Sequence, residues 1–245
     1  MLYRVLLFIV VLILSSCVSV QKQGAPVVDL DAQYAKEKGY YTVSSGETLY
    51  SIAWRLDRNY QSLAKINHIS PPYKLAVGEK IYLHSHGIKK TKPLLVVKPT
   101  KKTVTHKNVP LVKKTTKKSN VVHVKTIKSW TWPTQGKVVD QYSQTNKGIN
   151  ISGKEGQNVF AAASGQVVYA GNGLRAYGNL TIIKHNATYL SAYAHNKDLR
   201  VKEGDYIKQG QVIAHLGHTG TTKPMLHFEI RKKGKPVDPL HYLAH

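Results

Sequence analysis

The stretch Gly165-Gln-Val-Val-Tyr-Ala-Gly-Asn-Gly173 decides the fold of the C-terminal half of this 245-residue chain. Its β-branched and aromatic residues stand between glycines, which is typical of a short strand that ends in a turn. Similar runs lie on both sides of it, with turn residues about every 8–12 positions. These runs are Gly136-Lys-Val-Val139, Asn158-Val-Phe-Ala161, Leu180-Thr-Ile-Ile-Lys-His185, Tyr189-Leu-Ser-Ala-Tyr-Ala194, Gln211-Val-Ile-Ala-His215 and Leu226-His-Phe-Glu-Ile-Arg231. We therefore predict an all-β domain over residues 129–245, built from antiparallel sheets packed together.

Residues 130–243 resemble the LytM (lysostaphin-type) metallopeptidases. The resemblance rests on that glycine-bounded run and on four shorter motifs: Trp132-Pro133, Lys147-Gly148-Ile149, Tyr193-Ala-His195 and Leu226-His-Phe-Glu229. It implies a zinc site with two ligands from a His-x-x-x-Asp motif and a third from the second His of a His-x-His motif. A catalytic zinc needs about three protein ligands and a water whose pKa it lowers.

Most of that zinc chemistry is absent from the matching positions. The His-x-x-x-Asp positions fall on Asn146 and Asn150, and the first His of His-x-His is Met225. Asparagine is a poor zinc donor, and methionine cannot accept a proton. Of the chemical groups that the resemblance implies, His195 and His227 remain. We therefore predict a degenerate peptidase domain with no catalytic residue, no metal ligand set and no cofactor.

An alternative interpretation keeps a metal. His185, His215 and His218 lie on neighbouring runs and would form an unfamiliar metal site if the fold brought them together. A single histidine in a β domain is more often a hydrogen-bonded or exposed residue than a ligand.

Residues 40–84 form a second module. Tyr41-Thr-Val-Ser-Ser-Gly-Glu-Thr-Leu49 predicts a strand, a turn and a helix capped by Thr48, whose apolar face includes Leu49 and Ile52. A second helical stretch precedes Pro71-Pro72, and a returning strand ends the module. This βααβ order resembles the LysM module, a small α+β fold.

The LysM resemblance implies binding of peptidoglycan through N-acetylglucosamine units, in a groove between the loop before the first helix and the loop after the second. Three of the implied residues, Leu49, Ile52 and Asn67, are equally interpreted as core and capping residues. Carried over by position, the glycan-binding residues are Gly46, Glu47, Thr48, Leu49, Ile52, Asn67, Ile69 and Leu75.

The N-terminus predicts export. A basic start is followed by the apolar run Val5–Leu14, which is too short to span a bilayer comfortably. The sequence Leu14-Ser-Ser-Cys17 resembles a bacterial lipobox, which implies a signal peptide over 1–16 and lipid on Cys17. Val18 after the cysteine favours the outer membrane, with the chain on its periplasmic face. An uncleaved anchor helix is the alternative. Residues 17–39 read as a lipidated N-terminus and flexible tether.

Residues 85–128 contain thirteen lysines and no Asp or Glu, so we predict a basic disordered linker. It is either a solvated spacer or a weak electrostatic hold on anionic wall polymer or membrane. The formal net charge of +23 would ordinarily favour nucleic-acid binding, but an exported protein does not meet chromosomes. We therefore predict no nucleic-acid partner.

The complete layout of lipobox, LysM module, basic linker and degenerate LytM-type domain resembles the NlpD family of envelope lipoproteins. That resemblance implies activation of a periplasmic zinc amidase, an N-acetylmuramyl-L-alanine amidase, at the division septum. In this family the LytM groove engages the amidase and moves an autoinhibitory helix off the amidase's own zinc site. The candidate partner-binding residues are Asn146, Asn150, Arg175, Tyr177, His195, Met225 and His227.

Other interpretations stay open. His195 and His227 are also interpreted as packing or strand-pairing residues, and Arg175 as a solvated loop charge. At the level of the whole chain, the alternatives are a structural tether that binds peptidoglycan and an unconventional zinc endopeptidase of the cell wall.

Overall fold

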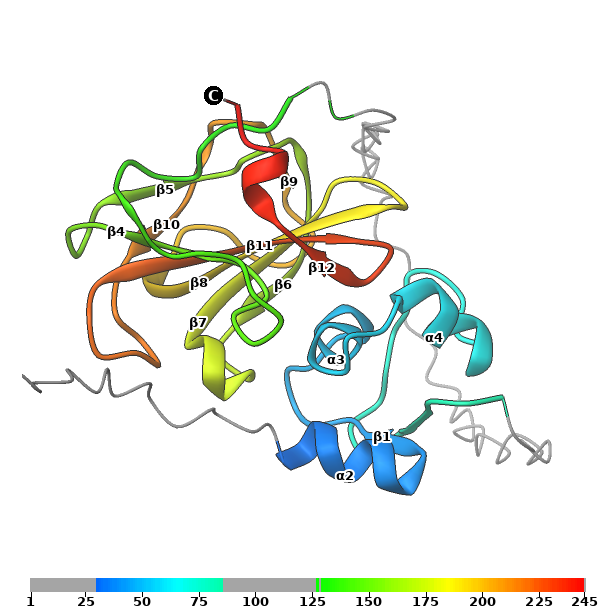
Figure 1. Ribbon diagram of the computed structural model, residues 1–245. Coiled ribbons are helices and arrows are strands. Elements are labelled where there is room, and N and C mark those ends of the chain that lie inside the picture. Colours follow the sequence, from blue (N-terminus) through cyan, green and yellow to red (C-terminus); the bar gives the residue numbers. More distant parts are fainter. Residues whose placement is uncertain (1–29, 86–126, 128, 245) are drawn as a thin grey trace, which may run out of the picture.

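The computed structural model of the chain describes residues 30–85, 127 and 129–244 (Figure 1). The predicted signal peptide, the lipidation site Cys17 and nearly all of the basic segment 85–128 lie outside these residues. Among the described residues, no helix is long and apolar enough to cross a membrane.

The LysM module has the predicted βααβ order. Strand β1 (Tyr40–Thr42) pairs antiparallel with β2 (Lys80–Tyr82), and helices α3 (Leu49–Arg55) and α4 (Tyr60–Ile66) lie between them in sequence. Thr48 caps α3 through a reciprocal pair of hydrogen bonds with Ser51, which satisfies amides that begin the helix without a partner. The helix cap and the strand pairing together confirm the small α+β module.

Helix α2 (Leu30–Lys38) corrects the prediction of a flexible tether up to residue 39. Ala32 and Ala35 are buried in the core of the LysM module, and the side chain of Asp31 pairs with Arg55 at 3.1 Å. Two alanines make a narrow apolar face, so the sequence carries no sustained helical period there. Packing against β1 stabilises this helix, although the local sequence pattern does not predict it.

The C-terminal domain is all-β, as predicted, and its paired strands are antiparallel. A ten-stranded sheet has the main order β3-β4-β11-β8-β7-β6-β9; β10 joins β5 to β8, and β12 pairs with β11. The elements are β3 (Val138–Asp140), β4 (Ile149–Ser152), β5 (Asn158–Phe160), β6 (Gly165–Gly171), η1 (Arg175–Tyr177), β7 (Asn179–Lys184), β8 (Tyr189–Leu199), β9 (Tyr206–Ile207), β10 (Val212–Leu216), β11 (Met225–Lys232), β12 (Lys235–Val237) and η2 (Pro239–His241).

Strands β6, β7 and β8 are buried on both faces. Side chains alternate across a strand, so Ile183 and Tyr193 join the core of the β domain. Leu180, Ile182 and Ala192 point the other way and join the core cluster of the LysM module. The LysM module therefore covers one face of the sheet.

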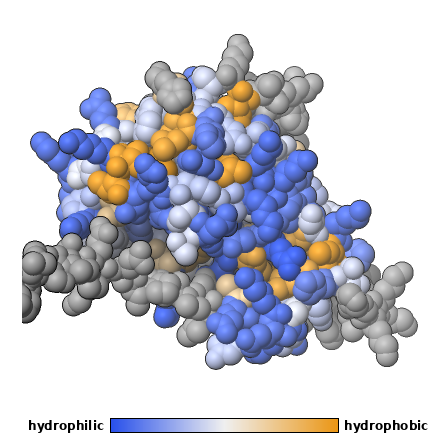
Figure 2. Space-filling model, viewed as in Figure 1, coloured by the Kyte–Doolittle hydropathy of each residue, from blue (hydrophilic) through white to orange (hydrophobic). Residues whose placement is uncertain are grey.

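Figure 1 shows α3 between α2 and the β domain. Polar contacts tie α3 to the sheet: the Thr48 hydroxyl donates to the Val168 carbonyl at 3.2 Å, and Arg55 donates to the Gly173 carbonyl at 3.0 Å. The visible face of the molecule is mostly hydrophilic, with hydrophobic residues in small separate patches (Figure 2). The large apolar surfaces of the two domains are used against each other.

Candidate functional site

Strand β11 presents a polar face toward the candidate site. Its sequence Leu226-His-Phe-Glu-Ile-Arg231 alternates, so His227, Glu229 and Arg231 share one face of the strand while Leu226 and Phe228 enter the core. All three polar side chains are buried, Glu229 and Arg231 almost completely. A charged side chain can be buried when ion pairs and hydrogen bonds compensate for its lost hydration, and the surrounding residues provide these contacts.

Glu229 is the centre of this buried network. Its carboxylate accepts a hydrogen bond from the Tyr177 hydroxyl at 2.7 Å and pairs with the Arg231 guanidinium at 3.0 Å. The His227 Nε2 lies 3.2 Å from the same carboxylate. Burial alone would raise the pKa of Glu229, but Arg231 and the hydrogen bonds lower it to about 2. The group is therefore a fixed buried anion.

Asn150 and His227 face each other across strands β4 and β11. The His227 Nδ1 lies 2.7 Å from the Asn150 side-chain oxygen, and the Asn150 amide nitrogen donates to Asp140 at 2.8 Å. Both polar atoms of Asn150 and both ring nitrogens of His227 therefore have protein partners.

Asn146 closes the loop that precedes β4. Its amide nitrogen donates to the carbonyls of Gln141 at 3.1 Å and Gly148 at 2.8 Å, and its backbone amide donates to the Ser143 hydroxyl. The side-chain amide therefore stabilises the conformation of the loop to which Asn146 belongs.

His195 enters the site from a bulge in β8. The β7–β8 register shifts beside it, and its backbone φ is +63°, a left-handed conformation that is uncommon outside glycine. The Nδ1 atom donates to the Thr219 carbonyl at 2.8 Å, and the ring centre lies 6.0 Å from that of His227. Burial and the neighbouring His227 lower the pKa of His195 to about 4, so its ring is neutral at pH 7.

These residues do not fit the zinc site of the LytM-type peptidases. The side chains at the two positions expected to carry His and Asp donate amide hydrogens to protein oxygens. His227, at the third position, is engaged at both ring nitrogens. Across the described residues, no group of three or more His, Cys, Asp and Glu side chains is arranged to hold a metal ion.

The structure does not bring together the three histidines of the alternative metal site. His185 is buried between the Ser164 carbonyl and the Ser191 hydroxyl, both at 2.8 Å, and burial lowers its pKa to about 4. His215 pairs with Asp198, and His218 pairs with Glu155.

A hollow of about 340 Å³ lies over the degenerate site, and we call it the groove. Five of the predicted partner-binding residues line it, whereas Met225 and the exposed Arg175 do not. Arg55 of the LysM module also contributes to its wall, so the groove belongs to both domains. The lining residues are Arg55, Thr145, Asn146, Lys147, Asn150, Ala176, Tyr177, His195 and His227.

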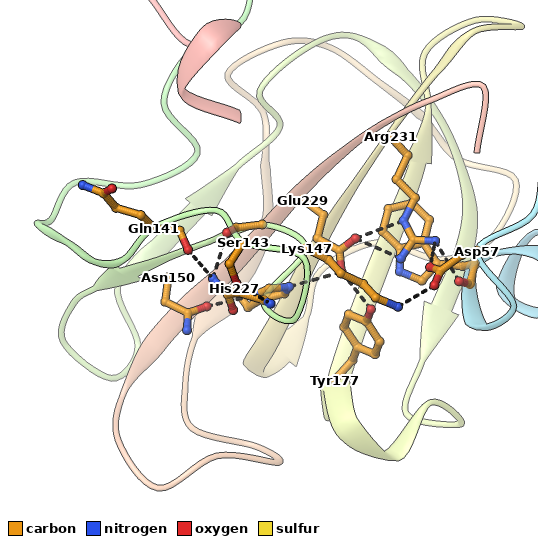
Figure 3. Close-up of polar contacts among 12 residues, drawn as sticks. Asp57, Gln141, Ser143, Lys147, Asn150, Tyr177, His227, Glu229 and Arg231 are labelled. Atoms are coloured by element: carbon orange, nitrogen blue, oxygen red, sulfur yellow. Dashed lines mark hydrogen bonds and ion pairs between the residues drawn. The ribbon is translucent and has the colours of Figure 1, made fainter. Parts of the chain in front are cut away.

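Arg231 connects this groove to the LysM module (Figure 3). Its guanidinium pairs with Asp57 at 3.0 Å, donates to the Trp54 carbonyl at 2.7 Å and lies 3.8 Å from the centre of the Trp54 ring. Lys147, beside Asn146, also pairs with Asp57 at 2.7 Å. A continuous polar network therefore runs from Tyr177 through Glu229 and Arg231 to Trp54 and Asp57, and we call it the Arg231 network.

The predicted glycan-binding residues fall into two groups. Leu49 and Ile52 are completely buried in the LysM core, and Asn67 hydrogen bonds to both backbone polar groups of Tyr82. The Glu47 carboxylate is held by Tyr41, the Ser44 amide and Arg55. Gly46 is exposed, whereas Thr48, Ile69 and Leu75 are partly buried.

Sequence reasoning missed the Arg231 network. Glu229 and Arg231 were visible as charges at alternate positions of an otherwise apolar strand, which is a signal for a buried pair. Asp57 and Trp54 carried no such signal, and neither did Arg55 in the groove, because their roles depend on the docking of one domain onto the other.

Two protein families match the chain. Residues 144–239 match Peptidase family M23, and residues 41–83 match the LysM domain. The fold and site therefore define the class: a LysM module packed on an M23-type domain with asparagine at two expected ligand positions.

Similar proteins span most of the chain. The lipoprotein NlpD/LppB homolog of Pseudomonas aeruginosa is 41% identical, covering 94% of this chain and 88% of that protein. The murein hydrolase activator NlpD of Escherichia coli is 40% identical, with 83% and 67% covered. The outer membrane antigenic lipoprotein B of Haemophilus influenzae is 38% identical, with 83% and 63% covered. The chain belongs to the NlpD/LppB family of lipoproteins.

Proposed function

We propose that this chain is a peptidoglycan-binding envelope lipoprotein that activates a periplasmic N-acetylmuramyl-L-alanine amidase. The LysM match supports peptidoglycan binding, and the name of the Escherichia coli relative supports activation of a murein hydrolase. The relatives named as lipoproteins support attachment to the outer membrane through Cys17. Activation at the division septum would split the wall between daughter cells.

One observation carries the proposal that this domain does not itself cleave the wall. Asn146, Asn150 and His227 stand where the family's zinc ligands are expected. The Asn146 amide nitrogen, both polar side-chain atoms of Asn150 and both ring nitrogens of His227 have hydrogen-bonding partners within the protein. A zinc ion would have to break several of these bonds and still lack an anionic ligand at position 150. The catalytic metal therefore belongs to the amidase.

The groove then acts by recognition. An activator shifts an autoinhibited enzyme toward its open state to the extent that it binds that state more tightly. A shift from 1:99 to 99:1 requires a difference of about 5.5 kcal/mol between the two binding free energies. The polar groups of the groove and the aromatic ring of Tyr177 supply such contacts, and the buried Arg231 network holds them in place.

The test uses the full chain, an autoinhibited periplasmic zinc amidase and dye-labelled peptidoglycan sacculi. We expect dye release from the mixture, with little release by either protein alone. Release by the chain alone would make it an endopeptidase and overturn the proposal. No release in any mixture, with retained binding to sacculi, would support the structural tether instead.

A further inference from the structure

A second hollow, of about 430 Å³, lies on the seam between the LysM module and the β domain. We call it the seam hollow. Its LysM wall includes Thr48, Tyr50 and Tyr73, and its β-domain wall includes Gln166, Lys184 and Glu203. The volume lies within the range of small-molecule binding sites. Both domains are needed to build it.

The LysM wall offers an aromatic surface. The ring of Tyr50 lies 4.6 Å from that of Tyr60 and 5.8 Å from that of Tyr73, and the two latter rings are 5.8 Å apart. Tyr50 and Tyr73 remain partly exposed, beside Pro71 and Pro72. Such a surface takes ligands that have an apolar face and a polar edge, which is the character of a pyranose ring.

The β-domain wall offers polar groups. The Lys184 ammonium lies 3.5 Å from the Tyr50 hydroxyl and 5.6 Å from the centre of the Tyr60 ring. Burial lowers the pKa of Lys184, and among the described residues no carboxylate lies within ion-pair distance of it. A partly desolvated ammonium is stabilised when a ligand oxygen accepts hydrogen bonds from it.

The charges of the seam hollow select a ligand that is neutral overall. One ammonium, from Lys184, and one carboxylate, from Glu203, stand on the same wall, so a polyphosphate gains no net attraction. The Gln166 amide adds an uncharged hydrogen-bonding group. Aromatic rings with mixed donors and acceptors fit a polyhydroxylated chain that carries amides.

We propose that the seam hollow binds an N-acetylated glycan strand between the two domains, with Lys184 and Gln166 of the β domain as contact residues. The proposal rests on the peptidoglycan binding proposed above and adds that the M23-type domain contributes to it. A ligand held by both walls favours the docked arrangement by mass action. That same arrangement places Arg55 in the wall of the groove, so wall binding supports the partner-binding form.

The test measures binding of the full chain to a β-1,4-linked N-acetylglucosamine tetramer by calorimetry. We expect Lys184→Met to weaken binding about tenfold, because it removes a charged hydrogen-bond donor and keeps most of the stem. Gln166→Ala should weaken binding severalfold. The matched control is Lys154→Met, which removes an exposed lysine that does not line the hollow.

The outcomes separate the two proposals. If Tyr73→Ala weakens binding while Lys184→Met and Gln166→Ala leave it unchanged, the site belongs to the LysM module alone and the inference is overturned. If the wild-type chain binds neither the tetramer nor sacculi, peptidoglycan binding itself fails. Gln166 is only partly buried and lies outside both cores, so its variant keeps the test decisive if Lys184→Met does not fold.

Discussion

Arg231→Met is predicted to separate the LysM module from the β domain. Methionine keeps most of the stem of Arg231 and removes the guanidinium, which is buried with a relative exposure of 1%. The change deletes ion pairs to Glu229 and Asp57 and the hydrogen bond to the Trp54 carbonyl. It also leaves the Glu229 carboxylate buried without its cation.

The expected cost follows from that unpaired anion. Removing one partner of a buried ion pair typically destabilises a protein by about 3–5 kcal/mol. For a domain of this size, such a loss corresponds to a fall in melting temperature of about 6–20 °C. Neutralising the stranded carboxylate should restore part of the loss, so adding Glu229→Gln to Arg231→Met should recover about 0.5–3 kcal/mol.

Urea denaturation of the full chain measures these free energies, and hydrogen exchange at the amides of α3 reports on docking. The matched control is Arg200→Met, which removes an exposed arginine and should change the unfolding free energy by less than about 0.5 kcal/mol. If Arg231→Met loses less than about 1 kcal/mol and α3 stays protected, the Arg231 network does not hold the domains together.

Three further predictions concern pH, backbone and metal. Burial lowers the pKa of His185 from 6.5 to about 4, so the contribution of its neutral ring to the unfolding free energy is complete above pH 6.5 and falls by about 3 kcal/mol toward pH 4. His185→Gln should flatten that part of the curve of unfolding free energy against pH. An unchanged slope would contradict this prediction. Gly234→Ala should cost more than about 1 kcal/mol in denaturation experiments, because φ is +82° and a Cβ would lie 2.5 Å from a backbone oxygen of the LysM module; Gly210→Ala, with φ +75° and open space, should cost less. Chelator competition should detect no tight zinc binding by the wild-type chain but measurable binding after Asn146→His with Asn150→Asp, and tight wild-type binding would refute our interpretation of the site.

The sequence was sufficient for both folds because local patterns and tertiary packing agree. Thr48 caps α3 as expected, and most of the glycine-bounded run 165–173 forms β6 (Gly165–Gly171). Helix α2 was not predictable, because Ala32 and Ala35 form too small an apolar face to raise a helical period.

Docking of the two domains was only partly visible in the sequence. Leu180-Thr-Ile-Ile183 is apolar at nearly every position, which indicates a strand that is buried on both faces. Nothing in that run says which element covers the second face. The groove was also only partly predictable from the sequence. Asn146, Asn150 and His227 were found from a motif, whereas Arg55 reaches the groove through a contact between domains.

The central claim is that the groove recognises the amidase, and Ala176→Trp tests it most directly. Ala176 is exposed and lines the groove without a role in the Arg231 network, so an indole there would fill the hollow. Ala187→Trp, at an exposed turn between β7 and β8, is the matched control. In the sacculus assay we predict that Ala176→Trp lowers amidase activation at least about tenfold, equivalent to about 1.4 kcal/mol of binding free energy, while the control activates normally. Normal activation by a folded Ala176→Trp variant would contradict the account.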